Sequence, residues 1–415
     1  FEIDPLAMWQ ESEVFDARQV TAQDVVFSLE RLRTDGFPHA SLLASVEDIT
    51  LISDQVLRIS LAHADADFPL RLASPYAVIM APDAIGSDVL FAPPTGSGPW
   101  IWTQGDSGQV NLKAWPLHHR IGFPAVQRIE MVPVSNLKTS ASLLKLGLVD
   151  IAQVDPLSAA DFNDQSINLV EAFRQGLGSI VIFNQNRAPF DDPENRRSIM
   201  QSVDPWGALD ASFTVGRVGV GIPLPDRSWE MPEDVLRTYF DVEEKSMIHN
   251  QSTQPLKLLV ANFGETHVEL GEILVEQLRE AGIPVEQQIL SRREYFKQVW
   301  QDRDFDFFVG PVPPSHTTND FLYGLLHSEG EQNIAGYSNS SMDYLIETQS
   351  KETNEELRNY LLQQIQQIIL DSAILFMPVI TAEMWGYGPR VDNFNPLMPL
   401  GSGDFWSTVT LAESP

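Results

Sequence analysis

Residues 21–32 read Thr-Ala-Gln-Asp-Val-Val-Phe-Ser-Leu-Glu-Arg-Leu, and this stretch decides the fold. Thr21 is of a residue type that caps helices, and Asp24 stands where a carboxylate favours the free N–H groups of the first turn. Apolar residues then recur at helical spacing, as at Val25 and Leu29. The stretch therefore predicts an amphipathic helix.

The wording of the same twelve residues resembles the TAEDVVFSLERL signature of the family 5 extracellular solute-binding proteins, the peptide- and nickel-binding components of ABC importers. Three further stretches carry the resemblance. Pro93–Trp100 is similar to the family's P-x-GTGPY loop, Phe183–Arg197 to its FN…PFDD…VR segment, and Asn333–Leu345 to its N-x-x-GYxNxxxDxLL segment. The resemblance implies a protein that binds a small solute and leaves it chemically unaltered.

Strands and helices alternate from Leu256 onward. We predict strands at Leu256–Ala261, Val285–Leu290 and Phe305–Gly310, with a helix at Glu265–Ala281 between the first two. Alternation at this spacing is typical of right-handed βαβ units and predicts a mostly parallel sheet.

Two other elements are predicted from pattern alone. Val46–Leu61 alternates apolar and polar residues around Ser53-Asp54, which predicts a hairpin. Thr353–Ser372 reads as a long helix opened by a capping box of Thr353 and Glu356. Its predicted buried stripe is Leu357, Leu361, Ile365, Ile368 and Ile369.

The family resemblance implies an α/β fold of the periplasmic-binding-protein-like type II class, a clamshell of two lobes with mixed sheets. We predict a first lobe of residues 1–186 plus 391–415 and a second lobe of residues 187–390. The chain begins well inside the family pattern. We therefore expect the N-terminal strands of the family domain to be missing from it.

Composition excludes several classes of function. The 57 acidic and 27 basic residues give a formal charge of −30, which opposes binding to a phosphate backbone. The absence of cysteine rules out disulfides, thiolate nucleophiles and cysteine metal sites. No apolar run approaches the ~18–20 residues of a membrane helix. We predict no nucleic-acid partner for this segment.

Sequence motifs for catalysis and for cofactors are absent. The glycines of Gly96-Ser97-Gly98 lack the spacing of a phosphate-binding loop, and the eight histidines form no HExxH motif. No G-x-S-x-G nucleophile elbow occurs. We therefore predict no catalytic residues, no metal and no cofactor.

Candidate ligand-binding residues follow from the resemblance. The glycine turn implies contacts from Gly96, Ser97, Gly98 and Trp100, and Trp385 offers an apolar wall. In peptide-binding members a Gly-Trp and an acidic stretch follow the strand that ends here at Gly310, but this chain has Pro311 and only Asp320 as an obvious carboxylate. The remaining candidates are His267, where dipeptide binders place a basic residue, and His316. The predicted hinge residues are Phe183, Asn184, Asn186 and Arg390.

The resemblance implies the substrate-binding component of an ABC importer for oligopeptides or a similar small solute. Its partners are then the solute and a membrane permease, its location is periplasmic or at the cell surface, and we predict a monomer. An alternative comes from another class of protein. The same domain follows a winged helix in transcription regulators of the sugar-phosphate-stress type, and the segment Gly401–Trp406 resembles the C-terminal end of those regulators. In that case the protein is a cytoplasmic sensor of a metabolite. The sequence upstream of Phe1 discriminates between the two.

Overall fold

The chain divides into two compact units in the computed structural model. Unit 1 comprises Phe1–Ala64, Phe68–Ala172 and Glu383–Pro415, and unit 2 comprises Asp65–Asp67 and Phe173–Ala382. The structure describes residues 1–12, 16–85, 95–105, 108–159, 162, 167–173, 177–210, 215–240, 254–396 and 405–412. Pro93, Pro94 and residues 401–404, used above for the family resemblance, lie outside these ranges.

Unit 2 contains a six-stranded mixed sheet with the strand order β11-β10-β12-β8-β13-β9. Only β10 pairs in parallel, with β11 on one side and β12 on the other, and the remaining pairs are antiparallel. The strands are β8 (Ser179–Phe183), β9 (Gly216–Gly219), β10 (Leu256–Ala261), β11 (Val285–Leu290), β12 (Phe307–Pro311) and β13 (Leu375–Thr381). The prediction of a mostly parallel sheet is wrong, because β8 and β13 come from outside the βαβ stretch and run against their neighbours.

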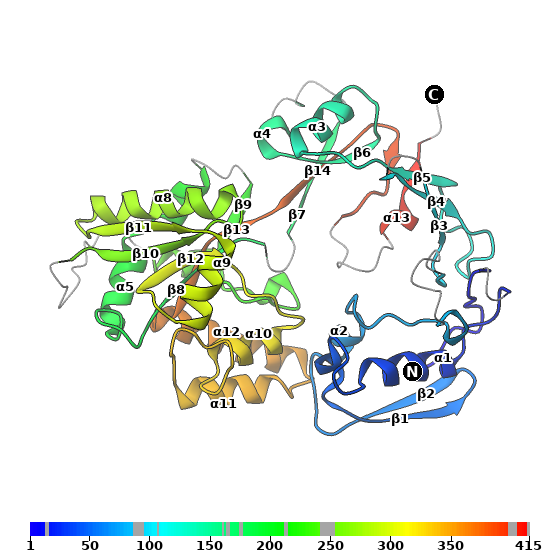
Figure 1. Cartoon of the computed structure of the whole chain (residues 1–415), viewed down its shortest axis with the longest axis horizontal. Coiled ribbons are helices and arrows are strands. Elements are labelled where there is room, and N and C mark those ends of the chain that lie inside the picture. The colour runs from blue at the N-terminus through cyan, green and yellow to red at the C-terminus, as the bar shows by residue number, and fades with distance from the viewer. Residues whose placement is uncertain are drawn as a thin grey trace. The chain divides into compact units, whose positions relative to one another are not determined.

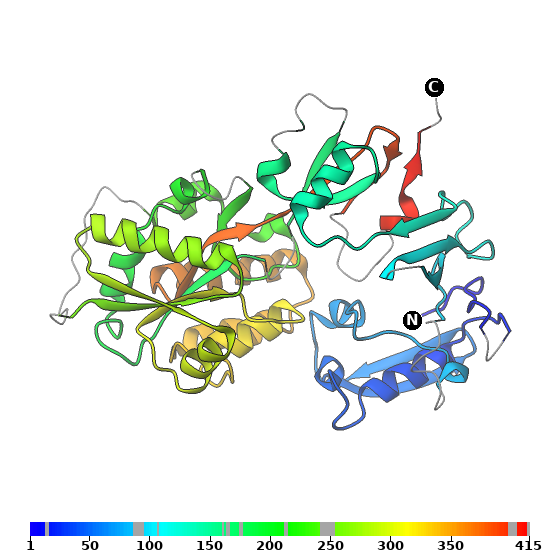
Figure 2. The ribbon, with the colours of Figure 1, turned by 45° about the horizontal axis from the view of Figure 1, so that its top comes forward.

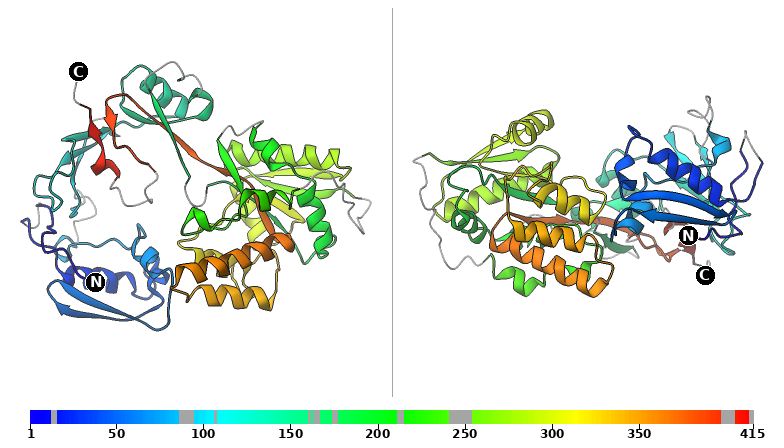
Figure 3. Two further views of the ribbon diagram at one scale, coloured as in Figure 1. Left: turned by 180° about the vertical axis from the view of Figure 1, so that it is seen from behind. Right: turned by 90° about the horizontal axis from the view of Figure 1, so that it is seen from below.

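Helices cover both sides of this sheet (Figure 1). The helix α8 (Glu265–Glu280) packs on β10, β11 and β12, and α12 (Glu355–Asp371) packs on β13. The pair α11 (Ser340–Gln349) and α12 lies side by side, as Figure 3 also shows. The other helices of the unit are α5 (Pro193–Gln201), α6 (Pro205–Ala208), α7 (Glu233–Arg237), α9 (Arg292–Tyr295) and α10 (Thr318–Leu326).

The strands and helices predicted from Leu256 onward are confirmed to within two residues at each end, apart from the cap of α12. Its N-cap is Asn354, whose side chain accepts a hydrogen bond from the Leu357 N–H group, so the predicted Thr353–Glu356 box is wrong. Leu357 is 48% exposed, and Arg358 is buried in its place. The apolar stripe therefore starts one turn later than predicted.

Arg358 is buried because it meets a carboxylate from a distant part of the sequence. Its guanidinium forms an ion pair with Asp67, which is fully buried in unit 2. Asp67 also accepts a hydrogen bond of 2.8 Å from the N–H group of Asn319 in the first turn of α10. The carboxylate thus satisfies a helix N-terminus and compensates a buried cation at once.

Unit 1 begins with a helix on a hairpin (Figure 2). The helix α1 (Ala22–Leu32) packs on the antiparallel strands β1 (Val46–Ser53) and β2 (Val56–Leu61), which confirms both predictions. Asp24 does more than favour the helix terminus. It accepts hydrogen bonds from the backbone of Thr21, from the indole of Trp9 and from Arg18.

The rest of unit 1 consists of three small sheets. One contains β3 (Trp100–Gln104), β4 (Val110–Ala114) and β5 (Arg128–Met131), and a second contains β6 (Ile151–Val154), β14 (Glu383–Tyr387) and β7 (Asn168–Ala172). The third is the pair β15 (Val391–Asp392) and β16 (Thr410–Leu411). The α-helices of this part are α3 (Leu137–Lys145) and the short α4 (Pro156–Ala159) and α13 (Phe405–Thr408), while α2 (Phe68–Leu72) packs in the same hydrophobic cluster as α1 and the hairpin.

The chain passes from one unit to the other at residues that differ from the predicted lobe boundaries 186/187 and 390/391. The changes lie at 172/173 and 382/383, and the short segment Asp65–Asp67 also belongs to unit 2. The first difference arises because β8 lies inside the sheet of unit 2, where it pairs with both β12 and β13. The second arises because β14 pairs with β6 and β7 of unit 1. In the described part of the chain, no helix is both long and apolar enough to cross a membrane.

Candidate functional site

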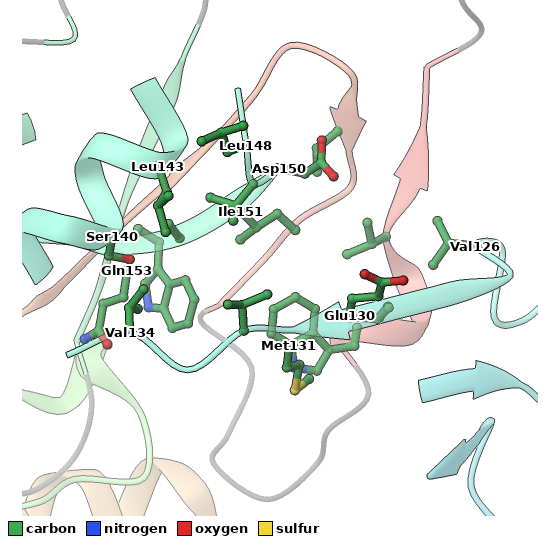
Figure 4. Close-up of a pocket in the computed structure, with 18 of the residues that line it drawn as sticks. Val126, Glu130, Met131, Val134, Ser140, Leu143, Leu148, Asp150, Ile151 and Gln153 are labelled. Atoms are coloured by element: carbon green, nitrogen blue, oxygen red, sulfur yellow. The ribbon is translucent and has the colours of Figure 1, made fainter. Parts of the chain in front are cut away.

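A cavity of about 890 Å³ lies within unit 1. Its walls come from β5 and the segment after it, α3, β6, β14, the β15–β16 pair and α13. Figure 4 shows Leu143, Leu148 and Ile151 on one side of this space and Met131 on the opposite side. The cavity therefore forms where separate small sheets and a helix meet.

The pairing of β6 with β14 positions one wall. Gln153 is opposite Trp385 in this antiparallel pair, and Ile151 is opposite Tyr387. Because side chains two residues apart on a strand point to one face, Ile151 and Gln153 share a face of the sheet with Trp385. The helix α3 starts at a well-defined point, since the Asn136 side chain accepts a hydrogen bond of 2.8 Å from the Thr139 N–H group.

Apolar side chains dominate the walls and continue onto the rim. Trp385, Trp406, Ile151 and Met131 line the interior. Around the opening, Leu148 is 67% exposed and Leu411 is 50% exposed, and Val132, Val134 and Leu137 are also exposed. An exposed apolar rim around an apolar hollow is typical of a surface that binds an apolar group.

The charged residues of the lining compensate one another. Arg128 forms an ion pair of 2.8 Å with Glu130, and the Arg390 guanidinium binds both carboxylate oxygens of Asp150. The hydrogen bonds that Arg390 donates to Asp150 raise the pKa of Arg390 above its usual value. The two pairs leave the cavity with no net formal charge.

The chemistry of the lining suits binding. Its described residues include two serines, Ser135 and Ser140, but no histidine, lysine or tyrosine that could act on them as a base. Tryptophan, leucine, isoleucine and valine side chains offer contact area with few degrees of freedom. This arrangement can hold a solute.

Of the eight predicted ligand-binding residues, which all lie in the described part of the chain, only Trp385 lines this cavity. Gly96, Ser97 and Gly98 form the loop before β3, where the side chain of Gln10 donates hydrogen bonds to the carbonyls of Gly98 and Trp100. A Cβ atom added at Gly98 would meet nothing within 4 Å. Crowding therefore does not explain the glycine, and a role of this loop in binding stays a prediction.

Three other predicted residues lie in unit 2, near the carboxyl ends of β10 and β12. His267 is in the first turn of α8, and its Nδ1 atom is 2.6 Å from the hydroxyl oxygen of Ser179. Burial lowers the pKa of His267, so the imidazole is neutral at pH 7. His316 is exposed in the loop after β12, and Asp320 lies in the first turn of α10. Their roles in binding stay predictions.

The predicted hinge residues make aromatic, hydrogen-bonding or ionic contacts within their own units. Phe183 is fully buried, and its ring packs against Phe190 and Phe376. The Asn184 amide donates to the carbonyls of Arg303 and Phe305, and its oxygen accepts from the N–H group of Asn186. These three residues lie inside unit 2, while the fourth, Arg390, lies in unit 1 beside the cavity. Their role as a hinge stays a prediction.

A metal centre has no support among the described residues, where no group of three histidine or acidic side chains is arranged to hold an ion. The adjacent rings of His118 and His119 have centroids 4.3 Å apart. Burial lowers the pKa of His118, and the neighbouring imidazole adds to this effect.

A second hollow, of about 750 Å³, lies in unit 2. Its lining includes Trp206, Arg217, Glu230 and Leu236, and Arg217 and Glu230 form an ion pair. No residue predicted to bind a ligand lines it, so the cavity of unit 1 is the better candidate.

Sequence reasoning did not select Gln153, Ile151 or Trp406 as site residues. The only available signal was the alternation of Ile151 and Gln153 along a short strand. That signal does not reveal the partner strand, because β14 lies more than two hundred residues later in the chain.

A solved structure shows the same fold. The putative peptide-binding protein AppA from Clostridium difficile superposes with a TM-score of 0.78 at 17% sequence identity, covering 97% of this chain and 88% of AppA. The predicted fold class, mixed α/β of the periplasmic-binding-protein-like type II, is confirmed. At this sequence identity the likeness shows the fold alone.

The family follows from the sequence comparison. Residues 15–333 match the family described as bacterial extracellular solute-binding proteins, family 5, middle, and the chain belongs to this family. It is 22% identical to heme-binding protein A of Haemophilus influenzae, over 91% of this chain and 74% of that protein. It is 23% identical to the probable di/tripeptide-binding protein 5 of Pseudomonas aeruginosa, over 94% of this chain and 79% of that protein. These relatives lend no support to the alternative of a transcription regulator.

Proposed function

We propose that the protein is the substrate-binding component of an ABC importer and that it binds a peptide or a similar small solute. Membership of the family 5 solute-binding proteins carries this proposal. The apolar cavity of unit 1 adds a physical site with space for part of a solute. The protein acts outside the cytoplasm, in the periplasm or at the cell surface, and hands its solute to a membrane permease.

The solute leaves the protein unchanged. The lining of the cavity offers tryptophans, aliphatic side chains and two internally compensated ion pairs. A cleavage or transfer reaction needs an activated nucleophile or a positioned acid and base. We therefore assign binding and release, without catalysis and without a cofactor.

The function requires the protein to signal that it is loaded. A solute that binds a closed form more tightly than an open form shifts the population toward the closed form. A micromolar solute has about 8 kcal/mol of binding free energy, so a preference of a few kcal/mol suffices for that shift. The predicted closure of two lobes is the form that we expect this change to take.

Thermal unfolding in the presence of pooled di- and tripeptides, followed by deconvolution of active pools, tests the proposal. A binding peptide is expected to raise the unfolding temperature and to reduce the radius of gyration in small-angle scattering. A pool of free amino acids serves as the matched control. If no pool of peptides or of similar small solutes changes the unfolding temperature, the importer function loses its basis. An unchanged radius at saturation would contradict closure alone.

A further inference from the structure

We propose that the cavity of unit 1 binds an uncharged aromatic or branched aliphatic group of the solute, with the Gln153 amide as the hydrogen-bonding partner. The cavity discriminates against a free carboxylate or ammonium group. The inference rests on the proposed function and names the chemical class that this site selects.

The charges of the lining disfavour an ionic group. Arg128 and Arg390 are the cations of the described lining, and each already binds a carboxylate, Glu130 and Asp150 respectively. A ligand carboxylate competes with Glu130 and Asp150 for these guanidinium groups, and a ligand ammonium competes with the guanidinium groups for the carboxylates. The described lining therefore offers an ionic group no counter-ion that is not already paired, although both pairs are largely exposed.

The walls favour a flat or branched apolar group. Trp385 and Ile151 lie on the β6–β14 face, and Trp406 contributes a second indole from α13. The apolar surface continues outward over Leu148 and Leu411, which are exposed to solvent. Covering this surface with an aromatic ring or a branched chain removes apolar area from water on both the ligand and the protein.

Gln153 supplies the polar contact. Within the described residues its side-chain amide makes no hydrogen bond, although the register of β6 and β14 places it on the same face as the Trp385 indole. A carboxamide offers both a donor and an acceptor without charge. An amide or hydroxyl of a solute can therefore be paired inside the cavity, and such a group needs no counter-ion.

Three probes with one ring and three charges test the inference: phenylacetamide, phenylacetate and 2-phenylethylamine. The full chain is labelled with 5-fluorotryptophan, and the ¹⁹F signals of Trp385 and Trp406 are assigned from the variants Trp385→Phe and Trp406→Phe. Phenylacetamide is expected to shift both signals with an affinity at least about tenfold higher than either charged probe. The signal of Trp9, which is buried in another cluster of unit 1, is the internal control and stays in place. Equal affinities for the three probes, or no shift at Trp385 and Trp406, overturn the inference.

Two variants of Gln153 sharpen the test. Gln153→Glu adds a carboxylate without a counter-ion, so the order of affinities is expected to reverse in favour of 2-phenylethylamine. Gln153→Leu keeps the volume but removes the amide, so phenylacetamide is expected to bind no better than toluene. The Trp9 signal at its native position shows that unit 1 is folded in both variants, and an unchanged order of affinities then overturns the role of Gln153.

The same spectra separate this inference from the proposed function. If a peptide from the pools raises the unfolding temperature but leaves the Trp385 and Trp406 signals unmoved, the importer function stands and the inference fails. If no solute binds but the three probes follow the expected order, the chemical preference of the cavity stands and the importer function loses support.

Discussion

The two units differ in how their cores are built. Unit 2 has one continuous core in which Phe183, Phe190 and Phe307 pack ring against ring on the central sheet. Unit 1 has several small clusters instead, one under α1, one around Trp9 and one around Phe394. Where small sheets meet without sharing a core, side chains leave space, and the cavity of unit 1 lies at such a junction. The difference teaches that the candidate site depends on incomplete packing, while the fold of unit 2 depends on complete packing.

The largest expected effect is on the aromatic core of unit 2. Phe307→Ala removes a fully buried ring that packs against both Phe183 and Phe190, and we expect a loss of about 4 kcal/mol in the free energy of unfolding. Leu143→Ala is the matched change in unit 1. Because Leu143 is only half-buried and already borders the cavity, we expect a loss of about 1 kcal/mol. Urea unfolding of both variants measures the two losses in the free energy of unfolding. Equal losses would contradict the difference in packing between unit 2 and the cavity region of unit 1.

The buried ion pair of unit 2 comes next. Asp67→Asn keeps an acceptor for the Asn319 N–H group but leaves the Arg358 guanidinium buried without its counter-ion. We expect a loss of about 3 kcal/mol in the free energy of unfolding. The double variant Asp67→Leu/Arg358→Met removes both charges and is the control. It is expected to be more stable than Asp67→Asn, and a double variant at least as unstable would show that the charge is not the cause.

A pH dependence is expected from the buried histidine of unit 2. The pKa of His267 is lowered in the folded state by burial, while the unfolded chain has the usual value of about 6.5. As the pH falls below about 6.5, His267 binds a proton in the unfolded state but stays neutral in the folded state until a lower pH. Unfolding therefore becomes easier, by at most about 1.4 kcal/mol per pH unit from this group.

His267→Gln is expected to remove this part of the pH dependence. Ser179→Ala is the control, because it deletes the hydroxyl 2.6 Å from the imidazole but keeps the titrating group. Urea midpoints at pH 8, 6.5 and 5.5 compare the three proteins. A wild type and a His267→Gln variant with the same slope against pH would refute the contribution of His267.

Local pattern sufficed for many elements of unit 2. The strand Leu256–Ala261 and the helix that follows it show their periods within a single window, and both are confirmed. The same method failed at Leu357 and Arg358, because the buried position of Arg358 depends on Asp67, which lies 291 residues earlier. Periodicity assigns a face to a helix but does not identify a distant ionic partner.

Most residues of the candidate site could not be predicted from the sequence. Trp385 was selected as an apolar wall, but Gln153 was not, because the two become neighbours only when β6 pairs with β14. The charges give the same lesson. Arg390 was selected as a hinge residue, and only the folded chain shows that its guanidinium binds Asp150 at the edge of the cavity.

The smallest expected effect on stability bears most directly on the cavity. Arg390→Gln breaks an ion pair that is largely exposed, with Arg390 at 65% and Asp150 at 45% side-chain exposure, so we expect a loss of less than about 1 kcal/mol in the free energy of unfolding. The same change leaves Asp150 without a counter-ion and gives the cavity a formal charge of −1. Binding of 2-phenylethylamine is therefore expected to strengthen about fivefold, and that of phenylacetate to weaken, while Arg237→Gln, on an exposed helix of unit 2, changes neither. In this variant the expected change in stability is small and the expected change in probe preference is large. Urea unfolding measures the contribution of the ion pair to the stability of unit 1, and ¹⁹F titration measures its contribution to the selection of a solute. A variant that loses stability without changing its probe preference would assign the Arg390–Asp150 pair to the fold alone.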